Sequence, residues 1–531
     1  MRTLFNYICA HVLILWCLLP LGNVAMGADN RQNSQASGDV GLVMDNALHS
    51  DSNRSTPDFY IDMSNVIESA VLAISTDISK LSALRAKPSS TPLLYIKEET
   101  DSRHPVMLSM ILKIALYLLW GIVLLILVYT VRHYFFTLNR LFGTQRHPYV
   151  DIDNADWPTV TVFIAAHNEE TVIAHSLEAL LDVDYPAAKL QIMPMNDRST
   201  DKTKEIIDDF VLRYPGRITP FHRVDGKPGK SAALKDATEL VSSEILIVFD
   251  ADYVPGRGLI KQLVAPFFDP ETGATMGRVV PLNTGSNLLT RLLDMERSGG
   301  YQVDQQARMN LYLVPQYGGT VGGVRRAALQ AVGGWRDDAL AEDTDLTYRL
   351  LLNGWKTVYQ NRSECYEEVP ESWPVRVRQI MRWAKGHNQA AFRYSSNLSM
   401  NNKVSWGEKL DGLLLLGVYA MSPVLLFGWG VAIFLFYFNT SNWLSGILAL
   451  FALMSYSALG NFAAFFEIAG AVYLDGSKQR VRLLPLNYFG FLVSLLAISR
   501  STFDQVVYDW IFKRKLVWDK TTRYRQTASV K

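Results

Sequence analysis

Residues 159–166 read TVTVFIAA, residues 190–195 read LQIMPM, and residues 244–249 read EILIVF. Each run is short and apolar, and each is followed by polar residues and then by a helix-like pattern. That order is typical of strand–helix–strand units, in which parallel strands are buried between helices. The three runs therefore predict an α/β fold built around parallel strands.

Polar residues follow each of the three expected strands directly. The first strand leads into Asn168-Glu169-Glu170, the second into residues 196–201 (NDRSTD), and the third into Asp250-Ala251-Asp252. Ligands of open α/β sheets bind outside the carboxyl ends of the strands. One acidic strand end means little, but three in sequence order predict a single polar site at this edge of the sheet.

Asp250 and Asp252 are separated by one residue on a segment that we expect to be extended. We expect one of these carboxylates to bind a hard cation while the other faces a ligand hydroxyl. Mg²⁺ or Mn²⁺ suits these oxygens and shares its remaining positions with substrate phosphates. The alternative is that this Asp-x-Asp only marks the end of a strand.

Two further polar stretches follow along the chain. Glu342 and Asp343 open a helical pattern, where a carboxylate serves either as a general base or as a helix N-cap. Residues 379–383 (QIMRW) combine a guanidinium suited to a diphosphate with an indole able to stack on a sugar ring. The same stretch also fits an amphipathic helix at a membrane interface, and the two interpretations are compatible.

The composition indicates a membrane protein with a large globular part. Only 19% of the 531 residues are charged, and the apolar residues are concentrated in a few long runs. The net charge of +1 excludes a general nucleic-acid binder, which needs clustered Lys and Arg. The three cysteines are too few for a disulfide framework or a four-cysteine zinc site.

Apolar runs and polar stretches divide the chain into six segments. We expect a signal peptide or N-terminal anchor at 1–27, an extracytoplasmic polar segment with one amphipathic helix at 28–105, a transmembrane helix at 106–131, a cytoplasmic catalytic domain ending in an interfacial helix at 146–400, transmembrane or interfacial helices at 411–511, and a basic tail at 512–531. Within the fifth segment, spans are expected at 413–438 and 443–472, whereas residues 483–511 could cross, re-enter or lie along the interface. The flanking charges leave the number of crossings open.

Seven motifs occur in order: AHNEE (166–170), NDRSTD (196–201), GKSAALKDA (229–237), FDADYVP (249–255), YGGTVGGVRR (317–326), AEDTDLTYRLLLNGW (341–355) and QIMRW (379–383). This set resembles the membrane-embedded, processive family-2 glycosyltransferases, which include the cellulose, hyaluronan, chitin and poly-N-acetylglucosamine synthases. The resemblance covers residues 150–395 and implies a GT-A type nucleotide-sugar-binding domain flanked by transmembrane helices.

The resemblance also implies roles for individual residues. Contacts to the donor are implied for Glu169, Asp197, Lys230, Asp250, Gln379 and Arg382. The divalent ion, Mg²⁺ or Mn²⁺, is implied to meet Asp250 and Asp252. Catalysis is implied for Asp343 as the general base, with Glu342 beside it. Contacts to the acceptor are implied for Gly318, Gly319, Thr320 and Trp383.

Other positions extend the resemblance or depart from it. Trp518 and Arg523 in the tail resemble a mobile segment that closes over the donor. Lys235 stands where the family usually has an asparagine, and His167 replaces a commoner Tyr or Phe before Asn168.

Three functional hypotheses follow from these observations. The first is an inverting transfer of sugar from a nucleotide sugar, expected to be a UDP-sugar, to a growing polysaccharide, coupled to export across the inner membrane. The second is the addition of a single sugar to a lipid carrier, and the third is an inactive scaffold for an envelope complex. The QIMRW motif and the flanking spans favour the first over the second, and the intact acidic positions count against the third.

The first hypothesis also specifies partners and a location. The expected partners are a nucleotide-sugar donor, a polysaccharide or lipid-linked acceptor, membrane lipids and envelope export proteins, without nucleic acid. The protein is expected to be integral to the bacterial inner membrane, with the catalytic domain in the cytoplasm and the N-terminal segment outside it. The motifs are shared by synthases of different polymers, so they do not name the sugar.

Overall fold

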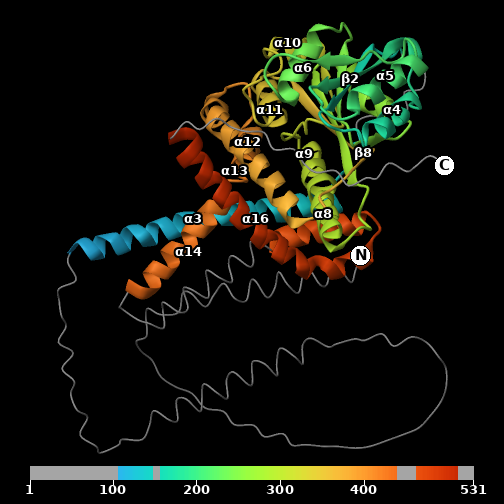
Figure 1. The fold of residues 1–531 in the computed structure, drawn as a ribbon. Coiled ribbons are helices and arrows are strands. Elements are labelled where there is room, and N and C mark those ends of the chain that lie inside the picture. Colours follow the sequence, from blue (N-terminus) through green and yellow to red (C-terminus); the bar gives the residue numbers. More distant parts are fainter. Residues whose placement is uncertain (1–105, 148–155, 439–461, 512–531) are drawn as a thin grey trace, which may run out of the picture. The chain divides into compact units, whose positions relative to one another are not determined.

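A computed structural model of the chain describes residues 106–147, 156–438 and 462–511 (Figure 1). The expectations for residues 1–27, 28–105 and 512–531, including Trp518 and Arg523, lie outside the described residues.

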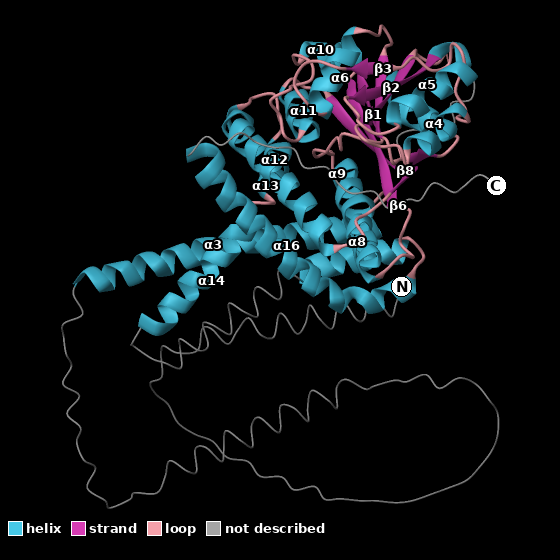
Figure 2. Cartoon of the chain, viewed as in Figure 1, coloured by secondary structure: helices cyan, strands magenta, loops and turns pink. Residues whose placement is uncertain are grey.

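The centre of the fold is one mixed sheet of eight strands, in the order β3-β2-β1-β4-β7-β6-β8-β5. Figure 2 shows the strands in magenta with helices in cyan around them. The strands are β1 (Val160–Ala166), β2 (Leu190–Asp197), β3 (Phe221–Arg223), β4 (Ile245–Asp250), β5 (Val254–Pro255), β6 (Thr272–Pro281), β7 (Gly322–Arg325) and β8 (Lys356–Glu367). β1 pairs in parallel with β2 and β4, which confirms the three strands predicted from the sequence. The sheet is not parallel throughout, because β7 runs antiparallel to both of its neighbours, β4 and β6.

Helices cover the sheet on both faces. One face packs against α4 (Ile173–Leu181), α5 (Thr203–Arg213) and α7 (Leu259–Val264), and the other against α6 (Lys230–Glu239), α10 (Arg326–Ala331) and α11 (Glu342–Leu352). In β1, Val162 and Ile164 contribute to the first core, whereas Phe163 between them contributes to the second. The strands are apolar in both directions because a sheet buried on two faces has no solvated side.

A long helix, α12 (Trp373–Met400), follows β8 and carries residues 379–383. Its Ala390 and Leu398 pack with α11 and with α13 (Trp406–Gly417). Its Ile380 and Ala384 pack with α16 (Leu484–Asp504). The helix therefore connects the sheet domain to the apolar C-terminal helices, as Figure 1 shows.

The structure also describes seven shorter helical elements. They are η2 (Ala187–Lys189), η3 (Ala265–Phe268), α8 (Leu288–Ser298), the π-helical η4 (Gly299–Gln305), α9 (Gln306–Asn310), η5 (Lys478–Leu483) and the π-helical η6 (Gln505–Ile511).

Three described helices are long and apolar enough to cross a membrane: Met107–Phe142, Met421–Phe438 and Gln479–Ile511. The first of them, α3 (Val106–Phe142), begins where the sequence predicts but continues past residue 131. Arg132 on this extension contacts Asp304 at 2.9 Å and Asp411 at 3.2 Å. The charged residues after the apolar run thus prolong the helix by pairing with η4 and α13 rather than ending it.

Residues 413–438 form two helices instead of the single expected span. α13 ends at Gly417, a turn occupies residues 418–420, and α14 (Met421–Phe438) follows. Pro423 lies in the first turn of α14, a position where the missing N–H of proline is tolerated, whereas it would break the interior of one continuous helix.

The other two C-terminal runs are described in part or in full. Of residues 443–472, the structure describes only those from 462 on, which belong to the apolar helix Phe462–Leu474. The run 483–511 is helical throughout, with α16 continued by η6.

Candidate active site

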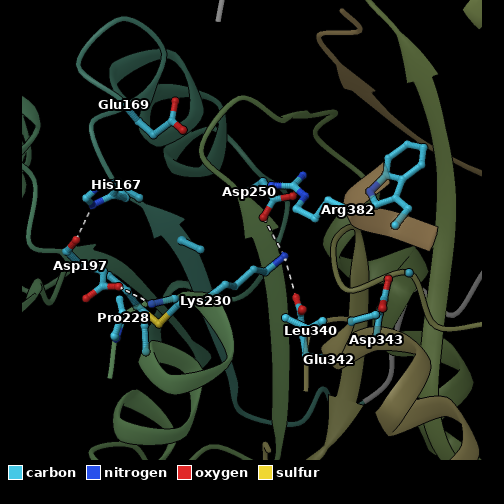
Figure 3. A pocket seen from close by; sticks show the side chains of 18 of the residues that line it. His167, Glu169, Asp197, Pro228, Lys230, Asp250, Leu340, Glu342, Asp343 and Arg382 are labelled. Atoms are coloured by element: carbon cyan, nitrogen blue, oxygen red, sulfur yellow. Dashed lines mark hydrogen bonds and ion pairs between the residues drawn. The ribbon is translucent and has the colours of Figure 1, made fainter. Parts of the chain in front are cut away.

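A cavity of about 470 Å³ opens at the carboxyl ends of β1, β2 and β4, the edge where the sequence predicts a polar site. Nine of the predicted site residues line it: Glu169, Asp197, Lys230, Asp250, Gly318, Glu342, Asp343, Arg382 and Trp383. They come from strand ends, from α6 and α11, and from α12, as Figure 3 shows for most of them. The fold therefore brings residues that are far apart in the sequence to one site.

The turns after β1 and β2 are tied to each other. The backbone φ is 55° at Asn168 and 58° at Arg198, a left-handed conformation that non-glycine residues seldom adopt, though asparagine does so more readily. Oδ1 of Asn168 accepts a hydrogen bond from the backbone N–H of Thr200 at 2.7 Å, and the N–H of Glu169 donates to Oγ1 of Thr203 at 2.8 Å. These bonds hold Glu169 close to the end of β2.

Asp197 is held by donors on three sides. Its Oδ1 accepts from Nε of Arg198 at 3.0 Å and from Nη1 of Arg223 at 3.0 Å, and its Oδ2 accepts from the N–H of Gly229 at 2.9 Å. Arg223 is only 5% exposed and donates through Nε to Asp236 at 2.6 Å. The carboxylate of Asp197 therefore has one fixed orientation at the cavity wall.

Lys230 lies at the centre of the acidic groups (Figure 3). Its Nζ is 2.7 Å from Oδ1 of Asp250, 3.4 Å from Oε1 of Glu342, and donates to the carbonyl oxygen of Gly319 at 2.8 Å. Burial lowers the pKa of Lys230, but the charges of Asp250 and Glu342 outweigh burial and raise the pKa above its usual value. The ammonium is therefore charged and links three segments of the site.

Glu342 and Asp343 begin α11 and face the same cavity. Burial raises the pKa of both carboxyl groups, and the charge of Lys230 offsets only part of that effect. Oδ1 of Asp343 accepts from the N–H of Thr344 at 2.6 Å, so this carboxylate also satisfies one donor at the helix start. An acid with a raised pKa at a cavity wall is suited to accept a proton from a bound hydroxyl.

The glycine turn before β7 supports this acidic pair. Gly319 has a φ of 72°, and a Cβ placed on it would lie 3.1 Å from Cβ of Asp343, so neither the conformation nor the space suits a side chain. Oγ1 of Thr320 accepts from the N–H of Asp250 at 3.1 Å. Of the three predicted acceptor residues in this turn, Gly318 lines the cavity, whereas Gly319 and Thr320 hold its other walls in place.

The QIMRW residues do not all face the same space. Arg382 and Trp383 line the main cavity, whereas Gln379 lines a second cavity of about 130 Å³. Trp383 borders both cavities, and the guanidinium carbons of Arg297 and Arg376 lie 5.1 and 5.3 Å from its ring centroid. Two cations thus hold the indole in the wall between the cavities.

The Asp-x-Asp pair is divided between the cavity and the interior. Asp250 is the last residue of β4 and lines the cavity, whereas Asp252 lies in the following turn and is 2% exposed. Within the described residues, no three His, Cys, Asp or Glu side chains are grouped as a metal centre. The donor set still fits Mg²⁺ or Mn²⁺, because such an ion is commonly held by one or two carboxylates and completed by substrate phosphates and water. Asp250 lines the cavity and Asp252 does not, and the metal-binding roles of both residues stay predictions.

Sequence reasoning missed several side chains of the site. Arg223 lies on a short strand outside the motifs, and Arg297 lies on α8, so no local pattern indicates that either reaches the cavity residues. His387 lines the cavity one helical turn after Trp383, and this spacing is the signal that could have found it. Of the departures from the family pattern, His167 lines the cavity and Lys235 is exposed on α6, 3.8 Å from Asp337.

A family model described as "Glycosyltransferase like family 2" matches residues 158–386. The matched range spans every strand and every cavity residue from Glu169 to Trp383. Residues 158–386 form a family-2 glycosyltransferase domain. The protein is therefore a glycosyltransferase, and its mixed α/β sheet agrees with the expected GT-A type fold. The match does not distinguish the processive synthases within family 2.

Curated relatives of this glycosyltransferase point in the same direction. The probable glycosyltransferase YdaM of Bacillus subtilis is 29% identical over 70% of this chain and 88% of its own length. A beta-monoglucosyldiacylglycerol synthase of Synechocystis is 31% identical over 49% of this chain and 54% of its own length, and one of Nostoc is 30% identical over 57% and 64%. The chain thus spans between half and two thirds of these two lipid glycosyltransferases.

Among solved structures, a mannosyltransferase from Pyrobaculum calidifontis, in complex with GDP-Man and Mn²⁺, is 21% identical. The alignment covers 69% of this chain and 98% of the mannosyltransferase, with a TM-score of 0.47.

Proposed function

We propose that this glycosyltransferase moves a sugar, with inversion of the anomeric carbon, from a UDP-sugar to an acceptor supplied from the membrane. One observation carries the proposal: Asp343 shares a cavity with Asp197 and Asp250 at the strand ends, with Lys230 of α6 and with Arg382 of α12. α12 in turn packs on α16, which belongs to a helix apolar enough to span a bilayer. Asp343 therefore lies between the residues proposed to bind the donor and the helix, α12, that leads to the apolar C-terminal helices.

The hydrogen bonds of Asp197 favour uracil as the base of the donor. A carboxylate oxygen has two lone pairs, and both of those on Oδ1 are taken by Arg198 and Arg223. Oδ2 accepts from the N–H of Gly229, so one further bond is available there. Uracil presents a single N–H on its pairing edge, which one lone pair satisfies, whereas guanine presents adjacent donors that require two.

The charge of the cavity favours a divalent cation with the donor. Five carboxylates line it, those of Glu169, Asp197, Asp250, Glu342 and Asp343, against the three cations Arg198, Lys230 and Arg382. A diphosphate would add more negative charge to an acidic site. When bound, Mg²⁺ or Mn²⁺ would supply charge stabilisation for the diphosphate, and Asp250 is the residue placed to hold it.

The chain's own side chains account for the other steps. Asp343 accepts the proton of the acceptor hydroxyl while that oxygen forms a bond to the anomeric carbon and the bond from that carbon to the diphosphate breaks. Attack from the face opposite the leaving group inverts the configuration. Arg382, positioned in the same cavity, stabilises the charge that develops on the diphosphate.

We propose a growing polysaccharide as the acceptor, with export across the inner membrane and a cytoplasmic catalytic domain. The position of Trp383 at the border of the main cavity supports a polymer, because the end of a growing chain in that cavity would lie against the indole after each addition. A lipid acceptor that receives a single sugar is the second candidate, and the lipid glycosyltransferases among the relatives favour it.

One assay tests the proposal and separates the two acceptors. Membranes containing the protein are supplied with radiolabelled UDP-glucose, UDP-N-acetylglucosamine or GDP-mannose, with dioleoylglycerol or a β-linked tetrasaccharide as acceptor. Product that grows with time beyond single additions supports the polymer, and a discrete lipid glycoside supports the second candidate. Transfer only from GDP-mannose would contradict the assignment of uracil, and full activity in excess chelator would contradict the role of the cation.

A further inference from the structure

His387 is a cavity residue to which the proposed reaction gives no role so far. It follows Trp383 by one turn of α12 and lines the same cavity as Asp343. Its Nε2 lies 3.3 Å from Oγ1 of Thr344, the residue after the candidate base. Its Nδ1 is buried and has no hydrogen-bond partner among the described residues. An unsatisfied buried nitrogen on a residue that lines a cavity calls for an explanation, and a bound ligand would supply one.

The approach of His387 to Thr344 depends on a glycine. A Cβ built on Gly386 would lie 2.6 Å from Cβ of Ala341 and 3.2 Å from its backbone nitrogen. Because the second contact is with backbone, a side chain at this position could not be relieved by a rotamer change. Gly386 therefore allows α12 to contact the start of α11, where Thr344 lies.

The imidazole of His387 is neutral at physiological pH. Burial, and then the charge of Arg308, lower its pKa to about 4. Its ring lies 4.7 Å from that of Tyr419, centroid to centroid. A neutral imidazole has one nitrogen that donates and one that accepts, so a partner at Nδ1 determines what Nε2 does.

Thr344 links His387 to Asp343, because its hydroxyl lies within hydrogen-bond distance of both. Its Oγ1 accepts a hydrogen bond from Nε2 of Gln316 at 3.0 Å and lies 3.3 Å from Oδ1 of Asp343. The hydroxyl has a single proton, which points either to Asp343 or to Nε2 of His387. If Nε2 carries the imidazole proton, it donates to Thr344, and the threonine proton is then directed to Asp343.

We propose that Nδ1 of His387 accepts a hydrogen bond from a hydroxyl of the acceptor sugar and thereby, through Thr344, directs a hydrogen bond to Asp343. The inference rests on the proposed function and deepens it. His387 is then an acceptor-binding residue and a positioning residue for the base, and it exchanges no net proton itself. A hydrogen bond to the ionised carboxylate favours that form, so Asp343 becomes ready to accept a proton when an acceptor is present.

Other charged or titratable groups around this pair have to be held constant in any test of pH dependence. They are Lys230, Asp250, Glu342, Arg308, Tyr301, Tyr317 and Tyr419. None of them is changed in the variants used.

The test uses His387→Gln, His387→Asn and Thr344→Val in the full-length protein in membranes. The amide nitrogen of Gln reaches the position of Nε2, whereas the amide of Asn lies near that of Nδ1. The acceptor is whichever of dioleoylglycerol and the tetrasaccharide the unmodified protein uses. UDP binding is measured for every variant, and Ser395→Ala, whose Oγ donates to the backbone of Ala391 on the same helix, is the control.

We expect the acceptor KM of His387→Gln to rise about tenfold, the loss of one hydrogen bond, with little change in the acid limb of kcat. His387→Asn should retain more of the acceptor affinity, and Thr344→Val should move the acid limb of kcat to higher pH with acceptor KM unchanged. UDP binding should be preserved in all three. If the His387 variants bind UDP and keep wild-type acceptor KM and pH profile, the role of His387 is wrong while the proposed function stands. If the unmodified protein transfers to neither acceptor, the proposed function itself fails.

Discussion

Nζ of Lys230 lies 2.7 Å from Oδ1 of Asp250, so the first residue of α6 neutralises the last residue of β4. The same ammonium reaches Glu342 at 3.4 Å and the carbonyl oxygen of Gly319 at 2.8 Å. A lysine from one motif thus compensates carboxylates from two others. Without it, the acidic cavity would repel the diphosphate of a donor.

Replacing Lys230 by Met should weaken UDP binding by at least about tenfold, because charge-assisted hydrogen bonds contribute about 1.5–3 kcal/mol. Calorimetric titration of UDP checks this. Lys235→Met is the matched control on the same helix, since Lys235 is half exposed and its ion pair with Asp337 is long, at 3.8 Å. Equal losses in the two variants would contradict a specific role for Lys230.

Asp343→Asn should reduce sugar transfer by about 10²–10⁴-fold while UDP binding survives, because an amide keeps the shape but cannot accept the proton. In the unmodified protein the raised pKa of Asp343 places the acid limb of kcat at higher pH than an ordinary aspartate would. Transfer by Asp343→Asn at the wild-type rate would remove this residue from the chemistry.

Asp343→Asn should also be more stable than the unmodified protein at neutral pH, although it loses activity. A carboxyl group whose folded pKa lies above its unfolded value binds the proton more tightly in the folded state, so stability falls as pH rises through that interval. Asn has no such cost. We therefore expect a higher Tm for Asp343→Asn at neutral pH and a smaller difference at low pH; thermal unfolding across pH measures both.

Arg223→Ala should destabilise the domain by about 3 kcal/mol, because it removes a buried partner from Asp197 and leaves that carboxylate less compensated. The loss should be accompanied by weaker UDP binding. Arg217→Ala is the comparison, because Arg217 donates only a long bond of 3.4 Å to a backbone carbonyl. Similar unfolding curves for the two variants would show that the Asp197 cluster is not a stabilising element.

Trp383→Ala should shorten the polymer about two- to tenfold, because loss of an aromatic contact worth roughly 0.5–1.5 kcal/mol speeds release of the chain more than it slows the chemistry. Hydrolysis of the donor without polymer is the extreme form of this result. Product length and membrane content are measured together, with Trp406→Ala on α13 as the control, since that side chain is exposed. A stable, membrane-bound variant that makes full-length polymer would overturn the processive interpretation.

Much of the sheet could be predicted because its signals are local. Residues 160–166, 190–197 and 245–250 are strands whose apolar content reflects burial on both faces, and each strand end carries the polar residues that the motifs indicate. Hydropathy does not predict the break at residues 418–420, because it averages over a window and hides a turn between two apolar helices.

Residue type and near neighbours along the chain were enough to select the acidic strand ends, Asp343 as the candidate base, and the QIMRW residues. Which of these residues line the same cavity is decided by packing between segments that are far apart in the sequence. Gln379 and Arg382 are three residues apart on α12 yet border different cavities, because Trp383, held by Arg297 and Arg376, forms the wall between them. The contact of His387 with Thr344 likewise exists only because Gly386 lets two helices touch, and no local pattern encodes that distance.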